Sequence, residues 1–432
     1  MMNIKNLLVL LAFALFFAAC DNDDEQPEPQ RQSATFQVTI ENTLPSFPFL
    51  ASAGTGLLMP GESSTFSFHA GKGTYLSFAT MLVQTNDLFY AFDEQGIRLY
   101  DDNGVAISGD VTAEILLWDA GTELNEQPGI GPNQAPRQAG PNTGDTENGT
   151  VLPITSINDG FSYPATTDNI RVNIIHDGNT QFTVTLENIS ANSTLPSPLA
   201  PGVWVVHSEQ NQLFTSGQPA DEGLEDIAED GNNTITLEGL TNNTGYTSPF
   251  APGVFAVHEA GLYPIFEENA SDAGQGLEAL AEDGNPSSLN TAISNLSGVT
   301  ANGVFNTPEG ASQAGPLLPG QRYTFMVTAE EGDYLSLATM LVHTNDLFYA
   351  FDEGGIALFS NGLAVSGDIS GSLKLWDAGT EVNEYPGAGN NQPARGGENS
   401  GPAENGTVRT VNDGFTYPSV ADAIKISINV QQ

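Results

Sequence analysis

One series of motifs occurs twice in this chain, in the same order both times. It runs Thr-Asn-Asp-Leu-Phe-Tyr-Ala-Phe-Asp-Glu, then Leu-Trp-Asp-Ala-Gly-Thr-Glu, then Asn-Asp-Gly-Phe-x-Tyr-Pro, and the copies end at 94 and 353, at 123 and 381, and at 164 and 418. A period this long is typical of a duplicated domain and not of a solenoid repeat. Since an opening strand is also repeated, at 36–42 and 182–188, the sequence predicts two tandem units over 34–177 and 180–432.

Short runs in both units alternate apolar and polar residues and are bounded by Gly, Pro and Asn. The runs at 36–40, 170–174, 323–327 and 424–428 show this pattern. Alternation with period two indicates half-buried antiparallel strands. The chain has 46 Gly and 26 Pro, and 39% of its residues are hydrophobic, which is enough for real cores. We therefore expect an all-β protein made of two antiparallel β-sandwich domains.

The second unit contains an extra segment that is itself duplicated, an insertion over about 196–285. The pair 198–207 and 223–231 returns as 249–258 and 276–284. The first unit lacks this segment and is expected to be a truncated version of the domain. Apolar residues at i and i+3 before a terminal Gly predict one short helix in each copy of the insertion.

The N-terminus has the features of a secretory signal. Lys5 precedes an apolar stretch, Leu7 to Ala19, which ends in Ala18-Ala19-Cys20. The stretch is too short for a transmembrane helix. Residues 1–20 resemble a bacterial signal peptide with a lipobox, in which Cys20 is lipidated. Cys20 is also the only cysteine, so it has no partner for a disulfide within the chain. The alternative is an ordinary signal peptide with an incidental cysteine.

Residues 21–33 are acidic, polar and broken by Pro, which predicts a disordered tether. An acidic cluster directly after the lipidated cysteine resembles the surface-export signal of some lipoproteins, although plain tethers are acidic too. We expect an exported protein, lipid-anchored to the bacterial outer membrane and facing the extracellular side or the periplasm. The net charge of −42 disfavours nucleic acid as a partner and attracts divalent cations.

The repeated motifs together resemble the spondin N-terminal domain in its bacterial form. The resemblance covers nearly all of 180–432 and most of 34–177, and Trp-Asp-Ala-Gly-Thr-acid is its most specific part. It implies a C2-like antiparallel β-sandwich of the kind found in secreted adhesive and matrix proteins, with a calcium site in its loops.

The resemblance also implies which residues bind calcium. Three acids form each site, one beside Asn-Asp and two from Asp-Ala-Gly-Thr-acid, which gives two ions in all: Asp87, Asp119 and Glu123 for the first, and Asp346, Asp377 and Glu381 for the second. The third acid is Glu here, where the animal members have Asp. Calcium prefers several oxygen ligands that include carboxylates, so the chemistry agrees. The alternative is that Asp119 and Asp377 form Asx turns after a buried Trp and that the glutamates are solvated.

Other polar and aromatic residues suggest structural roles. His207 and His258 end apolar runs and are expected to form hydrogen bonds at strand ends. The repeated Phe-Tyr pair at 89–90 and 348–349 is expected in the core, with a carbohydrate-stacking surface as the alternative. Asp159 and Asp413 are expected in turns. The Gly- and Pro-rich stretches 125–149 and 383–406 are expected to be long loops that carry binding.

No catalytic motif occurs in the sequence, which has no Gly-x-Ser-x-Gly, His-Glu-x-x-His or phosphate loop. We therefore expect a protein that is not an enzyme: a calcium-stabilised cell-adhesion or binding module for an extracellular glycan or a matrix or surface protein. The alternative is an enzyme or enzyme-associated module that acts on extracellular polymer with a pair of carboxylates.

Overall fold

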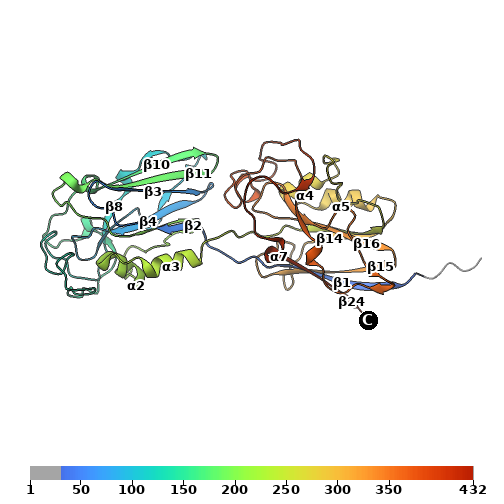
Figure 1. Ribbon diagram of the computed structural model, residues 1–432, viewed down its shortest axis with the longest axis horizontal. Coiled ribbons are helices and arrows are strands. Elements are labelled where there is room, and N and C mark those ends of the chain that lie inside the picture. The colour runs from blue at the N-terminus through green and yellow to red at the C-terminus, as the bar shows by residue number, and fades with distance from the viewer. Residues whose placement is uncertain (1–30, 432) are drawn as a thin grey trace, which may run out of the picture.

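The computed structural model describes residues 31–431, which form two lobes of mostly β-structure (Figure 1). The predicted signal peptide, Cys20 and nearly all of the predicted tether lie outside the described residues. Within the described part, every ladder between named strands is antiparallel, as the alternating pattern predicts. No helix of residues 31–431 has the length and apolarity needed to cross a bilayer.

The first domain is a sandwich of two sheets. One sheet has the order β3 (Ser63–His69), β11 (Gln181–Asn188), β10 (Ile170–Gly178) and β7 (Gly109–Asp110). The other has the order β2 (Phe49–Gly54), β12 (Val203–His207), β4 (Tyr75–Met81), β5 (Leu88–Ala91), β8 (Leu116–Asp119) and β9 (Leu152–Pro153), and β6 (Ile97–Arg98) pairs with β4.

The second domain repeats this arrangement. Its smaller sheet has the order β15 (Arg322–Glu330), β1 (Ser33–Asn42), β24 (Ile424–Gln431) and β21 (Gly367–Asp368). Its larger sheet has the order β14 (Val299–Phe305), β13 (Gly253–Glu259), β16 (Asp333–Met340), β17 (Leu347–Ala350), β22 (Lys374–Asp377) and β23 (Arg409–Thr410), and β18 (Ile356–Ala357) pairs with β16. A small hairpin joins β19 (Phe359–Ser360) to β20 (Leu363–Ala364).

Helices cover the outer face of each larger sheet. In the first domain these are α2 (Glu222–Glu225), the π-turn η4 (Asp226–Asp230) that continues it, and α3 (Thr234–Asn242); in the second they are α4 (Leu277–Asp283) and α5 (Ser287–Ser294). Single turns complete the set: α1 (Thr166–Asn169), α6 (Pro393–Gly396), α7 (Val420–Ala423), η1 (Thr112–Glu114), η2 (Ile154–Ser156), η3 (Ser190–Asn192) and η5 (Ser370–Ser372).

Each domain therefore has two hydrophobic cores. In the first domain Phe182 and Val184 of the smaller sheet pack with Phe78 of the larger sheet. On the other face of the larger sheet, Phe89 and Trp118 pack with side chains of the covering helices. The second domain repeats both layers. The helices are buried on one side only, so packing against the sheet holds these short segments in place.

The division of the chain at 177/180 does not match how the strands pair. The opening strand β1 lies between β15 and β24 of the second domain, with Val38 opposite both Phe325 and Ile428. Its repeat, β11, lies between β3 and β10 of the first domain. Figure 1 shows β1 in the lobe that holds the C-terminus. The first domain thus comprises about 49–245, and the second combines 33–44 with about 246–431.

The physical reason is the short connection between β10 and β11. Gly178 pairs with Gln181, so only Asn179 and Thr180 close the hairpin, and Asn179 adopts φ 50°. Closing such a small loop costs little chain entropy, so β11 takes the place beside β10. No described strand follows β24, and β1 fills the equivalent place there.

The duplicated insertion is also distributed differently from the expectation. One copy supplies β12 and α2 to the first domain, and the other supplies β13 and α4 to the second. The first domain therefore does not lack this segment and is not truncated. The short helices predicted before Gly231 and Gly284 are present, and both glycines have φ 64°. The helices α3 and α5 that follow them were not predicted.

The chain passes between the domains twice, through 43–48 and again after 245. Where they join the first domain, the two connecting segments are hydrogen-bonded to each other. Phe49 N donates to Asn243 O at 3.2 Å, and Gly245 N donates to Phe49 O at 3.1 Å. At the second domain, Asn42 Nδ2 donates to Ser248 O at 2.9 Å.

Candidate metal centres

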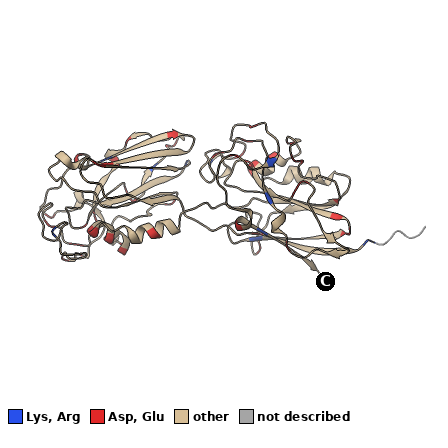
Figure 2. Cartoon of the chain, in the orientation of Figure 1, with Lys and Arg blue, Asp and Glu red and all other residues tan. Residues whose placement is uncertain are grey.

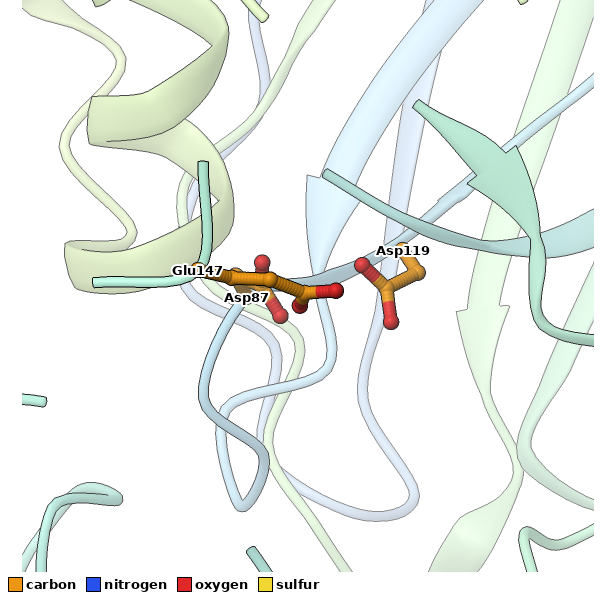
Figure 3. Close-up of side chains that lie close together, drawn as sticks. All are labelled: Asp87, Asp119 and Glu147. Atoms are coloured by element: carbon orange, nitrogen blue, oxygen red, sulfur yellow. The ribbon is translucent and has the colours of Figure 1, made fainter. Parts of the chain in front are cut away.

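Each domain brings three carboxylates together where β5 and β8, or β17 and β22, lie side by side. The first cluster is Asp87, Asp119 and Glu147, and the second is Asp346, Asp377 and Glu404. One carboxylate oxygen of each residue lies within 4.8 Å of the others in its cluster. Figure 3 shows the three side chains of the first cluster converging.

Strand pairing places the two aspartates. Leu88, the first residue of β5, pairs with Asp119 at the end of β8, so Asp87 lies directly beside Asp119. Leu347 pairs with Asp377 in the same way. The two loops therefore meet at one end of the sandwich. The sequence spacing alone could not establish this, because it depends on β5 and β8 being neighbours.

Two backbone N–H groups and one hydroxyl group hold Asp87 in place through one oxygen only. Its Oδ2 accepts hydrogen bonds from Thr122 N at 2.8 Å and Glu123 N at 3.1 Å, and from Thr122 Oγ1 at 3.2 Å. Asp119 Oδ1 accepts from Gly121 N at 2.7 Å and its Oδ2 from Asn125 Nδ2 at 2.6 Å. The Asx turn at Asp119 therefore exists together with the acid cluster, and the two readings of this motif do not exclude each other.

The third carboxylate comes from a repeated Glu-Asn-Gly-Thr-Val motif, residues 147–151 and 404–408. Glu147 N donates to Thr122 O at 2.9 Å, and Gly149 N donates to Gly121 O at 2.7 Å. Gly121 has φ 70°, and a Cβ on it would lie 2.6 Å from Thr150 N, so only glycine allows this close approach. The Asp-Ala-Gly-Thr loop thus positions the second loop and its glutamate.

The buried aspartates are difficult to ionise in the absence of a cation. Burial raises the pKa of Asp87, and the nearby charge of Asp119 raises it further. Burial also raises the pKa of Asp119. Asp87 is fully buried and Asp119 is 1% exposed, whereas Glu147 is exposed at the surface. Like charges at this separation disfavour ionisation, and a bound cation reverses that effect.

One buried oxygen in each cluster has no hydrogen-bond partner. These atoms are Asp87 Oδ1 and Asp346 Oδ1. Buried polar atoms are nearly always paired, so an unpaired carboxylate oxygen beside two further carboxylates is suited to bind a cation. The donor set consists of oxygens only, which suits a hard cation such as Ca²⁺ or Mg²⁺. The residues present therefore fit a metal ion in each domain.

The second cluster contains a counter-charge that the first lacks. Arg409 Nη2 donates to Asp377 Oδ2 at 2.9 Å and to Glu404 at 2.8 and 2.9 Å. In the first domain Leu152 holds the equivalent place, because Leu152 pairs with Asp119 as Arg409 pairs with Asp377. Burial and the charge of Asp346 raise the pKa of Asp377, and the Arg409 charge opposes this rise.

Glu123 and Glu381, expected as the third acids, lie outside the clusters. Glu123 Oε1 accepts from Gly144 N at 2.7 Å and its Oε2 from Asn86 Nδ2 at 3.3 Å. Glu381 Oε1 accepts from Asn345 Nδ2 at 3.2 Å. Both carboxylates are buried and directed at neighbouring loops, and only their backbone N–H groups contact the cluster aspartates. The recurrence of Glu-Asn-Gly-Thr-Val is the sequence signal that could have identified Glu147 and Glu404, and it was missed in the sequence-based prediction.

The remaining predicted residues have structural surroundings. His207 Nε2 and His258 Nε2 hydrogen-bond with Ser77 Oγ and Ser336 Oγ, both at 2.9 Å, as expected for histidines at strand ends. The Phe-Tyr pairs at 89–90 and 348–349 are fully buried, so they belong to the cores and do not offer a stacking surface. Asp159 and Asp413 accept hydrogen bonds from the backbone two residues later, as turn residues do.

No protein-family model matches this chain, and no curated protein matches it.

Proposed function

We propose that each cluster binds one calcium ion and that the protein is a calcium-stabilised binding module of the spondin-like, C2-like type. The observation that carries the proposal is the unpaired buried oxygen of Asp87, repeated at Asp346, within a set of three carboxylates. Calcium accepts irregular oxygen geometry and keeps some water, which suits a site with one exposed glutamate. Magnesium requires near-octahedral geometry and gives up water reluctantly.

The burial of the acids supports a role as a binding or adhesion module over that of an enzyme. Asp87 and Asp119 are at most 1% exposed, so they cannot reach a polymer substrate as a glycosidase pair must. Their position at the base of the long loops 120–151 and 378–408 suits an ion that rigidifies a binding surface. Glycans and matrix or surface proteins are the partners we propose, on the cell surface or in the periplasm, with Cys20 as the lipid anchor.

The test compares two pairs of glutamates. The change Glu147→Gln together with Glu404→Gln removes charge from both clusters, whereas Glu123→Gln together with Glu381→Gln leaves the clusters intact. Extracellular calcium modules bind with Kd of roughly 0.1–1 mM, so calcium at about 2 mM should stabilise each wild-type domain by roughly 0.6–1.8 kcal/mol. Thermal melts in chelator, calcium and magnesium measure this response.

We expect the first double variant to lose most of the calcium response and the second to keep it. Magnesium should stabilise the wild type much less. An equal response to both metals that survives the first double variant would mean general screening of the −42 charge and would exclude the sites.

A further inference from the structure

The two domains meet around a cleft of about 310 Å³ whose lining comes from both. Its wall contains a stacked pair, His69 of the first domain and Tyr385 of the second, with ring centroids 3.7 Å apart. Beside it, Lys72 N donates to Asn390 Oδ1 at 2.7 Å, and a Cβ on Gly71 would lie 2.3 Å from Ala388 O. The domains are in direct contact here, so the cleft is a built feature of the fold.

Arg395 lines this cleft, and the charge of Glu384 acts on it without a direct contact. No nitrogen of its guanidinium donates a hydrogen bond or forms an ion pair within residues 31–431, and its Nη1 is buried. Burial lowers the pKa of Arg395 from its ordinary value, and the charge of Glu384 partly opposes this. The carboxylate of Glu384 accepts hydrogen bonds from Asn391 and Asn345 and forms no ion pair with Arg395. Arg395 is half-buried, and a guanidinium that forms no hydrogen bond or ion pair with the protein loses solvation without direct compensation.

The repeat offers an internal control, because Arg137 occupies the same place in the first domain's loop. Each loop contains an Asn-Gln pair, and the arginine comes three residues after the Gln: Arg137 after Gln134, and Arg395 after Gln392. Arg137 Nε donates to Gly131 O at 2.8 Å, and its Nη2 donates to Gln134 Oε1 at 3.4 Å. In the second domain neither bond forms, and Gln392 Oε1 is left without a partner as well. The loop of the first domain thus provides hydrogen-bond acceptors for its own arginine. The equivalent loop of the second domain, which faces the other domain, does not.

The other lining residues indicate what kind of anion fits. Tyr385 is 39% exposed and Tyr246, His69 and His343 add aromatic surface, while Ser208, Thr247 and Thr416 add hydroxyl groups. Burial lowers the pKa of His343, and the charge of Arg395 lowers it as well, so Arg395 is the formal cation of this lining. Aromatic faces and hydroxyl groups suit a hydroxylated ring, and a guanidinium pairs with a carboxylate through two hydrogen bonds.

We propose that the interdomain cleft binds an acidic sugar, whose carboxylate pairs with Arg395. The volume accommodates a single uronic acid ring or the end of an acidic glycan. Acidic residues outnumber basic ones on both domains (Figure 2), so most of the surface repels anions. The positive charge of Arg395 favours an anion at this one place. This site is separate from the acid clusters and does not require a metal ion.

The experiment measures binding of glucuronate and galacturonate to the purified protein by calorimetry, with glucose and galactose as neutral controls. The variants are Arg395→Gln and, as the matched control, Arg137→Gln. We expect uronates to bind the wild type at least tenfold more tightly than the neutral sugars. Arg395→Gln should lose that preference, and Arg137→Gln should keep it.

Three outcomes would overturn the proposal. One is the absence of uronate binding by the wild type, and another is equal binding by wild type and a folded Arg395→Gln variant. The third is tighter binding of a short peptide with a free C-terminal carboxylate than of any uronate, which would assign the cleft to peptide ends. A calcium response that survives Glu147→Gln together with Glu404→Gln would overturn the metal sites and leave the result here unaffected, so the two proposals fail separately.

Discussion

The two domains are built from the same motifs, but only the first contains all its strands in one stretch of chain. The second is completed by β1, which comes from the other end of the described chain and lies between two of its strands. Sequence repeats therefore identify which strands are equivalent, whereas loop length decides which equivalent strand joins which domain.

The same comparison extends to the acid clusters. The first cluster has Leu152 beside Asp119, and the second has Arg409 beside Asp377. A guanidinium within the second cluster supplies positive charge that only a bound cation could supply in the first. We expect the first domain to depend on metal more strongly than the second.

Removal of β1 should have the largest effect. Phe36, Val38 and Ile40 are fully buried in the second domain, and their burial contributes about 5–9 kcal/mol. This is comparable to the whole stability of a domain. A fragment of residues 246–432 should therefore show no cooperative melt by circular dichroism, and addition of a peptide of residues 31–44 should restore one.

The matched control is a fragment of residues 48–245, which contains every strand of the first domain and should melt cooperatively alone. A cooperative melt of 246–432 without the peptide would contradict the importance of β1.

Arg409→Leu should make the second cluster resemble the first. In chelator the change leaves buried Asp377 without its ion pair. The resulting loss of stability should be about 1–3 kcal/mol, below the usual cost of breaking a fully buried pair because the Arg409 side chain is 34% exposed. Scanning calorimetry in chelator and in calcium should show a lower melting temperature and a larger calcium response. An unchanged calcium response would separate Arg409 from metal binding.

Leu152→Arg makes the reverse change in the first cluster. A guanidinium that reaches Asp119 and Glu147 would compete with the ion, and we expect calcium affinity there to fall about tenfold, or ~1.4 kcal/mol. Calcium titration followed by calorimetry measures this, with Leu152→Met as the uncharged control. If both variants bind calcium equally, charge at this position does not set the affinity.

The smallest effect should be the pH dependence of stability due to His207 and His258, which should be the same in both domains. Burial lowers the pKa of His207 and of His258, so below about pH 6.5 the unfolded chain binds protons that the folded chain does not. Stability should therefore decrease as the pH falls from 6.5, and less so in His207→Gln and His258→Gln variants, to the same extent in each. Urea melts from pH 7.5 to 5.5 test this, and a response confined to one domain would break the symmetry.

The sequence predicted the strands, the buried aromatic residues and four of the six clustered acids. It did not predict that β1 would pair with β24, because 36–42 and 182–188 are nearly interchangeable and local pattern cannot choose between them. Glu123 was preferred to Glu147 because it lies within the motif that supplies Asp119. The Glu123 carboxylate instead accepts a hydrogen bond from Gly144 N. Gly144 lies in a loop whose path is set only in the folded structure.

The position of β1 has a mechanical consequence. A force that pulls the N-terminal part of the chain away from a ligand on the first domain enters β1 at Ser33 and leaves it at Asn42. It thus runs along one extended strand, which antiparallel ladders hold on both sides. Phe49 and Gly245 are hydrogen-bonded to each other, so the two segments that connect the domains leave the first domain at one point and both carry the load. The force therefore loads β1 in shear and does not pull the two ends of the second domain apart. The fold can transmit such a load without unfolding.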